Sequence, residues 1–514
     1  MNNRSDVIDK ATVETPSGRL AGSRRRGVFK FRGIPFAKPP VAGLRWRMPE
    51  PAEPWVGVRD ATQAGAVCPQ APTPFDALLG GALSAQSEDC LYLNVFAPAL
   101  EGQMLPVMVW IHGGAFVIGA GSQPIYDGVS LAARGAVVVT INYRLGVFGL
   151  LDLRDGAGED MPGTGVEGVA DQLLALDWVR RNIAAFGGDP GNVTIFGESA
   201  GAMCVAALLA APARGLFHRA ILQSGAAHVG SDREKSCRVA HAVLNALSLS
   251  RQDWRLLLDI PAGALLKAQV SVLASAHDGK DLERLGRLPF QPVIDGRLLA
   301  EKPIAALRGG AARDIPLLVG TTREEWKLFS APDPRSRLMT SAGFEARVAR
   351  TAGEATPDLL RAYGSGRIFE RYNAFMTDRT FAVPAHKLLE TRAAGAPAFA
   401  YRFDWRSRLL GGIFGSCHAL ELGFVFGTHG EGAASAFFGK GALAEKLAHD
   451  MMSSWTAFAR TGDPSSPASG LWPRYDSDAR ATMIFGDGAP HVVNAPERDR
   501  MDAWETVPDQ KIGA

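Results

Sequence analysis

The sequence predicts an α/β fold, a central and mostly parallel sheet with helices on both faces. Short apolar, β-rich runs alternate with helical segments along the chain, which favours parallel strands. A Gly-Glu-Ser-Ala-Gly turn at 197–201 also separates a β-rich run at 192–196 from small apolar residues at 200–210. A strand, a sharp turn and a helix in this order expose a serine at the end of a sheet strand.

The remaining elements follow from hydrophobic periodicity. Short strands and turns are expected at 11–15, 27–31 and 33–35, followed by an irregular Pro-, Gly- and Ala-rich segment at 38–90. A helical pattern at 169–186 ends at Gly-Gly-Asp-Pro, a sequence that stops helices. The predicted sheet strands are 91–96, 107–111, 137–142, 192–196, 220–224, 315–319 and 398–403.

Length and composition favour one globular domain. The chain has 514 residues, of which 46% are hydrophobic and 21% charged, as in folded proteins. Enzymes of the α/β class reach this size as one domain by carrying insertions. We expect residues 1–514 to form a single catalytic domain with helical insertions at about 230–310 and 330–395, because no low-complexity linker isolates them.

Charge and hydropathy exclude several classes of partner. The net charge of +2 argues against nucleic acid, and the three arginines at 24–26 are expected in a solvated hairpin turn. The apolar run at 200–213 is too short for a membrane span and contains Pro212. The first ten residues lack the apolar core of a secretory signal, so we expect a cytoplasmic protein, secreted or periplasmic only if a signal was removed.

The cysteines argue against a disulfide scaffold and against zinc. There are five, an odd number, and none has CxxC spacing. Cys68 and Cys90 could close one loop, whereas Cys204 falls on the apolar helix after Ser199, where core packing is expected. No HExxH motif, Walker loop or convincing dinucleotide fingerprint is present, so no metal and no cofactor is expected.

Ser199, in the Gly-x-Ser-x-Gly turn, is the candidate nucleophile. A serine hydroxyl needs a base, an orienting carboxylate for that base, and donors for the oxyanion. The motif His112-Gly113-Gly114 follows the apolar strand at 107–111, and its paired glycines leave backbone N–H groups unobstructed. We predict an oxyanion hole made by Gly113, Gly114 and the amide of Ala200.

In this architecture the acid and then the base follow the serine along the chain. His418 comes after the late strand at 398–403 and is the candidate base, with His429 and His449 as alternatives. The acid should end a late strand. Glu324 and Glu325 stand side by side after the strand at 315–319, and spacing alone does not choose between them.

Motifs over nearly the whole chain resemble the type B carboxylesterase family, especially its bacterial para-nitrobenzyl-esterase-like members; the family also contains cholinesterases. The resemblance implies an α/β-hydrolase fold and serine ester hydrolysis without a cofactor. The matching stretches are FRGIPFA (31–37), SEDCLYLNV (87–95), HGGAF (112–116), NYR (142–144), 182–201, GTT (320–322), HALELGFVFG (418–427) and WTAFARTGDP (455–464).

The resemblance also assigns roles to residues. It implies a catalytic triad of Ser199, Glu325 and His418, because the family's acid is the second of the two carboxylates. Glu198 and Ser224 match polar residues beside the triad that are thought to tune it. Trp326 is a departure, since many relatives have glycine there, and it adds bulk beside the acid.

Other matches are structural. The resemblance implies a disulfide between Cys68 and Cys90, whereas the family's second disulfide has no counterpart here. It also implies two salt bridges. These join Arg45 to Glu88 and Arg144 to Asp171.

Substrate range follows from two further matches. The stretch at 288–296 resembles the family's acyl pocket, and we predict that Leu288, Phe290, Phe116 and Glu198 contact the substrate. The 68–90 loop has Phe75 as its one aromatic residue and lacks the tryptophan that holds choline in cholinesterases. We therefore expect a small-molecule ester substrate, neutral and of short to medium chain length, aryl esters included.

Two other functions share this framework. A lipase, or an amide or carbamate hydrolase, would use the same catalytic groups on a different substrate. A non-catalytic adhesion protein would keep the fold without the triad, but this chain retains all the expected catalytic positions.

Overall fold

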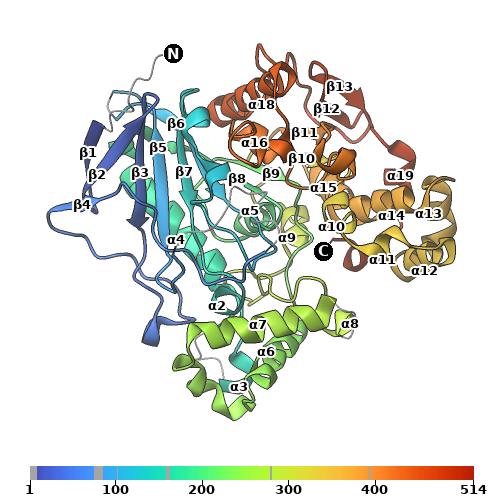
Figure 1. The fold of residues 1–514 in the computed structure, drawn as a ribbon, viewed down its shortest axis with the longest axis horizontal. Helices are drawn as coiled ribbons and strands as arrows, with labels where there is room; N and C mark the ends of the chain where they lie inside the picture. The colour runs from blue at the N-terminus through green and yellow to red at the C-terminus, as the bar shows by residue number, and fades with distance from the viewer. Residues whose placement is uncertain are drawn as a thin grey trace.

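A single sheet crosses the molecule in the computed structural model, which describes residues 9–73, 85–100, 102–157, 163–277, 281–392 and 395–513. In the described residues its order is β1-β2-β3-β5-β7-β6-β8-β9-β10-β11-β12-β13, with β4 beside β2 (Figure 1). The strands are β1 (Asp9–Thr15), β2 (Gly18–Arg25), β3 (Val28–Pro35), β4 (Val58–Asp60), β5 (Tyr92–Ala97), β6 (Leu105–Ile111), β7 (Val137–Ile141), β8 (Gly188–Glu198), β9 (Arg219–Gln223), β10 (Leu317–Thr322), β11 (Ala398–Phe403), β12 (Ala481–Phe485) and β13 (His491–Asn494).

The centre of this sheet is parallel. Strands β7, β6, β8, β9, β10, β11 and β12 pair in parallel, whereas β1, β2, β3 and β5 on one side and β13 on the other pair antiparallel. The predicted α/β fold with a mostly parallel central sheet is therefore confirmed. Because parallel strands end at one edge, the residues that follow β6, β8 and β10 can converge there.

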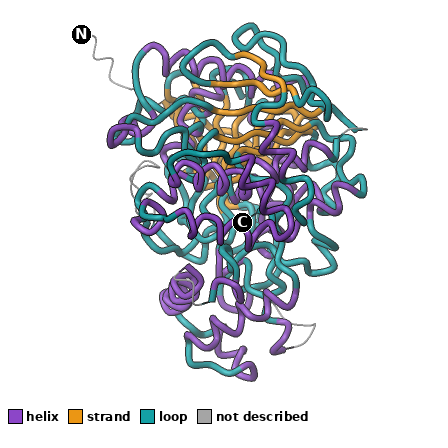
Figure 2. Tube along the Cα trace, turned by 90° about the vertical axis from the view of Figure 1, so that its right-hand side faces the viewer, coloured by secondary structure: helices purple, strands orange, loops and turns teal. Residues whose placement is uncertain are grey.

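Helices cover both faces of the sheet and extend beyond it (Figures 1 and 2). The helices are α1 (Val129–Ala132), α2 (Gly146–Gly149), α3 (Arg154–Ala157), α4 (Glu167–Asn182), α5 (Ala200–Ala210), α6 (Arg233–Ala246), α7 (Ala262–His277), α8 (Leu282–Leu285), α9 (Pro303–Arg308), α10 (Lys327–Ser330), α11 (Pro334–Arg337), α12 (Ser341–Ala352), α13 (Thr356–Ala362), α14 (Ile368–Thr377), α15 (Val383–Glu390), α16 (Leu422–Val425), α17 (Ser435–Phe438), α18 (Ala442–Thr461) and α19 (Arg498–Ala503). A π-helical turn at Asp378–Ala382 joins α14 to α15.

The sheet separates two hydrophobic cores, because successive side chains of a strand point to opposite faces. On β6, Val107, Val109 and Ile111 belong to the core that contains α5. Met108 and Trp110 belong to the core that contains α18. A strand buried on both faces reads as a continuous apolar run, which is why the sequence predicts β6 clearly.

The two segments expected as insertions are largely helical. Residues 230–310 contain α6 to α9, and residues 330–395 contain α11 to α15 (Figure 1). Helices α12, α13, α14 and α19 share a small core of their own.

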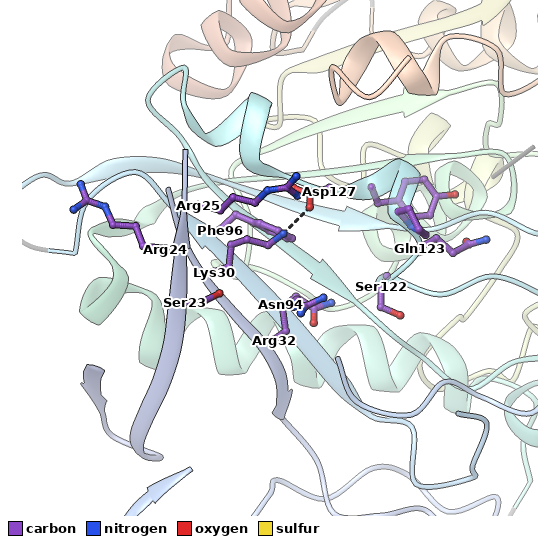
Figure 3. Close-up of a pocket in the computed structure, with 13 residues that line it drawn as sticks. Ser23, Arg24, Arg25, Lys30, Arg32, Asn94, Phe96, Ser122, Gln123 and Asp127 are labelled. Carbon is purple, nitrogen blue, oxygen red and sulfur yellow. Dashed lines mark hydrogen bonds and ion pairs between the residues drawn. The ribbon is translucent and has the colours of Figure 1, made fainter. Parts of the chain in front are cut away.

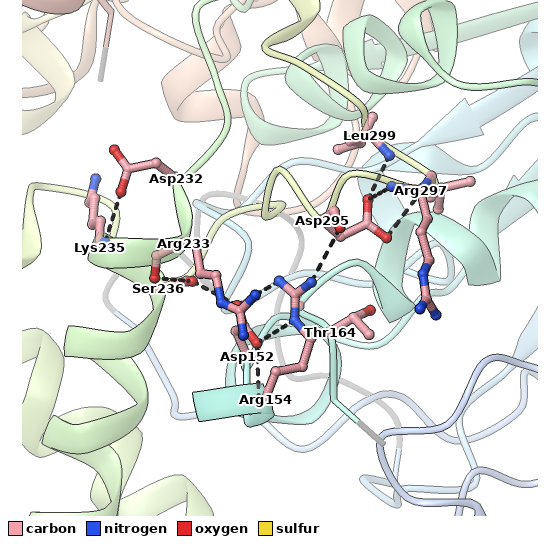
Figure 4. A network of polar contacts seen from close by, with 12 residues as sticks. Asp152, Arg154, Thr164, Asp232, Arg233, Lys235, Ser236, Asp295, Arg297 and Leu299 are labelled. Carbon is pink, nitrogen blue, oxygen red and sulfur yellow. Dashed lines mark hydrogen bonds and ion pairs between the residues drawn. The ribbon is translucent and has the colours of Figure 1, made fainter. Parts of the chain in front are cut away.

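A buried polar network ties the first of these segments to the sheet domain (Figure 4). Arg154 forms a bidentate ion pair with Asp152 at 2.8 Å and donates to the carbonyl of Asp295 at 3.2 Å. The hydroxyl of Ser236, on α6, donates to Asp152 at 2.8 Å. The network therefore links α6 and the backbone at Asp295 to the segment that holds Asp152 and Arg154.

The basic run at 24–26 forms the predicted hairpin between β2 and β3, with Arg26 in a left-handed conformation. Arg24 and Arg25 also line a cavity of about 450 Å³, shown in Figure 3. Its buried cation, Lys30, pairs with Asp127 at 2.6 Å. Arg32 donates to the carbonyl of Thr62, so the inner cations already have partners.

Both predicted salt bridges are confirmed, but the disulfide is absent from this structure. Arg45 donates to Glu88 at 2.7 Å and Arg144 to Asp171 at 2.7 Å. Cys68 and Cys90 are buried free thiols. The contact with Cys68 and burial both raise the pKa of Cys90, so the two thiols lie within hydrogen-bond distance of each other. Phe75, in the same loop, lies outside the described residues.

Candidate active site

Ser199 occupies a strained turn between β8 and α5. Its backbone has φ 55° and ψ −125°, a conformation that non-glycine residues rarely adopt. The glycines on either side permit this turn. A Cβ atom on Gly197 would lie 2.5 Å from the backbone of Gly201, and one on Gly201 would lie 2.1 Å from the carbonyl oxygen of Ile111. The motif therefore exposes the serine where β6 and β8 end.

The predicted oxyanion donors lie against the serine. A Cβ atom on Gly113 would be 3.1 Å from Cβ of Ser199, so only glycine lets the two backbones approach this closely. Within the described chain the amides of Gly113 and Gly114 have no hydrogen-bond acceptor. The amide of Ala200, at the first position of α5, has no intrahelical acceptor. These donors are available to a ligand at Ser199.

Glu325 and His418 form a buried pair. Oε2 of Glu325 lies 2.6 Å from Nδ1 of His418, and Oε1 accepts the amide of Thr322 at 2.7 Å. Glu324 faces away, since its carboxylate binds Lys327 at 2.7 Å and the amide of Ser416 at 2.9 Å. The residue pattern left two carboxylates open, and the structure places Glu325 against the histidine.

The other imidazole nitrogen, Nε2 of His418, lies 3.0 Å from Oε1 of Glu198. Within the part of the chain that the structure describes, no hydrogen bond joins Ser199 to His418. Glu198 directly precedes Ser199, so its carboxylate brings a negative charge next to both the imidazole and the serine. Catalytic hydrogen bonds often tighten only when substrate binds.

Three buried carboxylates surround this imidazole. Burial lowers the pKa of His418, but the charges of Glu198 and Glu325 outweigh burial and raise it to about 9. Burial, together with the charge of Glu325, raises the pKa of Glu198 to about 7. Burial and the two other carboxylates raise the pKa of Glu421 to about 8. The cluster therefore favours a protonated imidazole.

Aromatic rings enclose His418. The centres of the Phe381 and Phe329 rings lie 4.7 and 5.3 Å from the imidazole centre. Phe329 is 36% exposed, so it stands where the site meets solvent. Trp326 packs on Phe329 at 5.0 Å, and its amide donates to Thr377 at 3.1 Å. The extra bulk of Trp326 beside the acid therefore packs against the Phe329 ring.

The predicted apolar substrate contacts are located by their burial and core packing. Phe116 and Phe290 are fully buried, and both share a hydrophobic core with Ala200. Leu288 is half-buried and packs against that core. Ser224 directly follows β9, and its amide donates to the carbonyl of Gly320 at 2.8 Å.

Three residues near His418 were not predicted from the sequence: Glu421, Phe329 and Phe381. A glutamate in the apolar run HALELGFVFG is a signal that could have identified Glu421. No local sequence pattern distinguishes the two phenylalanines from core residues. The two alternative bases have other partners. His429 stacks on Phe424, and His449 forms a hydrogen bond with Arg134.

Comparison with known proteins decides the family. A sequence model of the carboxylesterase family matches residues 9–504. The chain belongs to the carboxylesterase family. It is 42% identical to the para-nitrobenzyl esterase of Bacillus subtilis, covering 95% of this chain and 97% of that protein. It is 33% identical to the phenmedipham hydrolase of Pseudarthrobacter oxydans, over 95% of this chain and 97% of that one.

Solved structures agree with this assignment. A Geobacillus stearothermophilus carboxylesterase superimposes on this carboxylesterase with a TM-score of 0.86 at 40% identity, covering 96% of this chain and 100% of that one. The protein is a carboxylic ester hydrolase, and the predicted family, α/β-hydrolase fold and activity are confirmed. Among its described residues no helix is long and apolar enough to cross a bilayer, and no group of three or more His, Cys, Asp or Glu side chains could hold a metal ion.

Proposed function

We propose that this carboxylesterase hydrolyses small esters through Ser199, His418 and Glu325, within one catalytic domain. The 2.6 Å contact between Glu325 and His418, beside the strained Ser199 turn, carries the proposal. Glu325 orients the imidazole through Nδ1 and supports its positive charge. Nε2, which lies beside Glu198 in this structure, takes the serine proton once the substrate is bound.

The reaction proceeds in two halves. Nε2 of His418 takes the Ser199 proton as Oγ bonds to the ester carbonyl carbon. The oxyanion is stabilised by the amides of Gly113, Gly114 and Ala200. The C–O bond to the alcohol then breaks, and His418 gives the proton to the leaving oxygen. Water repeats these steps on the acyl-enzyme, releasing the acid and restoring Ser199.

The pH dependence should reflect the carboxylates around His418. Only the neutral imidazole accepts the serine proton, so activity is lost as pH falls through the raised pKa. We expect the acid limb of kcat/KM above the ordinary histidine value of about 6.5. Glu198→Gln removes one carboxylate charge and should move this limb to lower pH by about one unit. A wild-type profile flat from about pH 5 to 9 would contradict a histidine base, and a limb moved upward would contradict the role of Glu198.

For substrates, we propose neutral esters of short to medium acyl chain, aryl esters included. The name of the para-nitrobenzyl esterase relative supports esters with an aromatic ring in the alcohol part. Amides and carbamates stay the second candidate, because the same catalytic groups would hydrolyse them. The apolar surroundings of Leu288 and Phe290 support an uncharged acyl group near the serine.

Choline esters should be poor substrates. We expect butyryl and acetyl nitrophenyl esters to exceed the matching thiocholine esters in kcat/KM, because no tryptophan is present in the 68–90 loop to hold the cation. A panel that adds longer nitrophenyl esters and an emulsified triglyceride measures the acyl range and tests the lipase alternative. A thiocholine ester that wins clearly would show that another ring binds the cation.

The acyl pocket can be tested at Leu288. Leu288→Phe adds volume to a half-buried position, so it should reduce kcat/KM for the butyryl ester several-fold more than for the acetyl ester. Equal losses on both esters would place Leu288 outside the pocket.

A further inference from the structure

Two backbone carbonyl oxygens beside the predicted oxyanion donors are each held by a side chain. The hydroxyl of Tyr143, just after β7, donates to the carbonyl oxygen of His112 at 2.8 Å. Nδ1 of His112 in turn lies 2.9 Å from the carbonyl oxygen of Gly113. A carbonyl oxygen only accepts, so Nδ1 of His112 carries the proton. Residues 112 and 113 belong to no helix or strand, so side chains satisfy these carbonyls in place of a backbone ladder.

These two carbonyls belong to the peptide units that carry the donors. The carbonyl of one residue and the N–H of the next lie in one plane, and in a trans peptide they point in opposite directions. The bond from Tyr143 therefore aims the N–H of Gly113, and the bond from His112 aims the N–H of Gly114. A hydrogen bond to a carbonyl oxygen also polarises its peptide unit, which makes the N–H on the other side a stronger donor.

The third predicted donor receives the same support from a helix. The N–H of Ala200 shares its peptide unit with the carbonyl of Ser199, and this carbonyl accepts the amide of Met203 at 3.0 Å. All three predicted donors therefore have an occupied carbonyl on the far side of their peptide. At the end of β6, where no helix follows, two side chains do what the first turn of α5 does for Ala200.

Both side chains are fixed in place. Tyr143 and His112 are each 1% exposed, and their rings stack with centres 4.5 Å apart. Burial lowers the pKa of His112 to about 4, so the imidazole stays neutral near pH 7. Gly119 closes over this bond, since a Cβ atom there would lie 2.5 Å from Nδ1 of His112 and 2.5 Å from the carbonyl oxygen of Gly113. The donor peptides therefore have little room to turn.

We propose that Tyr143 and His112 are positioning residues of the oxyanion hole, which orient and polarise the peptide units of Gly113 and Gly114. Each acts through one backbone amide and not on the substrate itself. Donors that need not reorient as negative charge develops favour the transition state over the bound ester. The inference rests on the proposed function, because it needs an oxyanion to form at Ser199.

Tyr143→Phe tests this inference, because it removes one hydroxyl and keeps the ring. Two inhibitors are compared. An alkyl trifluoromethyl ketone forms a hemiketal with Ser199 and places an oxyanion in the hole, whereas the matching trifluoromethyl carbinol forms none. We expect Tyr143→Phe to raise the Ki of the ketone, and to lower kcat/KM for 4-nitrophenyl butyrate, by roughly tenfold, less than the loss of a whole donor. The Ki of the carbinol should change by less than about twofold.

Tyr475→Phe is the matched control. It removes a hydroxyl that donates to Glu390 at 2.8 Å, so it should leave the ratio of the ketone Ki to the carbinol Ki unchanged. His112 provides a second test. His112→Asn keeps an amide N–H near the position of Nδ1, whereas His112→Ala removes the donor. The asparagine variant should therefore bind the ketone more tightly than the alanine variant, relative to the carbinol.

Three results would overturn the inference. One is a ketone-to-carbinol Ki ratio in Tyr143→Phe equal to that in Tyr475→Phe. Another is an equal loss of affinity for both inhibitors at an unchanged Tm, which indicates a purely structural role. The third is an equal ratio in His112→Asn and His112→Ala, and this comparison decides the question if Tyr143→Phe does not fold. Failure of the proposed function looks different, because the ketone would then bind Ser199→Ala as tightly as it binds the wild type.

Discussion

Ser199→Ala should lower kcat for a neutral nitrophenyl ester by about a millionfold, to the residual rate that binding and the oxyanion donors sustain. The variant loses the atom that forms the acyl-enzyme while the backbone amides of Gly113, Gly114 and Ala200 remain. The measurement is single-turnover hydrolysis on purified protein, with protein mass spectrometry after treatment with an organophosphate. Wild type should gain one adduct at Ser199, and the variant none.

Ser224→Ala is the matched control. Ser224 also follows a central strand and also has a positive φ, of 50°. The hydrogen bond from its backbone amide to the carbonyl of Gly320 does not involve the side chain. The variant should therefore lose no more than about tenfold in kcat. Substantial hydrolysis by Ser199→Ala, with contaminating esterase excluded, would be incompatible with the mechanism.

Glu325→Gln should cost about four orders of magnitude in kcat, the second-largest effect we expect. The amide preserves the shape of the side chain but removes the charge that supports the imidazolium. It can also donate to Nδ1 and so favour the wrong tautomer. Because the carboxylate is fully buried, solvent cannot replace the lost charge.

Glu324→Gln is the control for this prediction, since it changes the neighbouring carboxylate in the same way. Lys327, its partner, also pairs with Glu370 at 2.8 Å, so the lysine stays compensated. We expect less than about a tenfold loss in kcat. Melting temperatures of both variants separate catalysis from folding, and the reverse ranking of activities would identify Glu324 as the acid.

Local backbone chemistry makes several parts of this enzyme predictable from its residues alone. The helix at Ala200–Ala210 and the strand at Ala398–Phe403 have the predicted bounds. Gly197, Gly113 and Gly201 are recognisable because a side chain at these positions would collide with backbone. Strands buried on both faces were predicted because they appear in the sequence as continuous apolar runs.

Elements without a strong local pattern were missed. Strand β13 is partly exposed and has four residues, and β12 has five, too few for a period to emerge. Helix α18, which was also not predicted, is amphipathic and packs its apolar side on the second core. That α18 covers this face of the sheet follows from tertiary packing and not from a local pattern.

Which charged groups meet depends on tertiary packing. Without the family resemblance, the residues left Glu324 and Glu325 equivalent, and the end of β10 directs one to His418 and the other to Lys327. Glu421 is buried near the imidazole, and this burial, which a local pattern does not specify, raises its pKa to about 8. Such contacts depend on how separate helices pack, so no spacing rule in the sequence contains them.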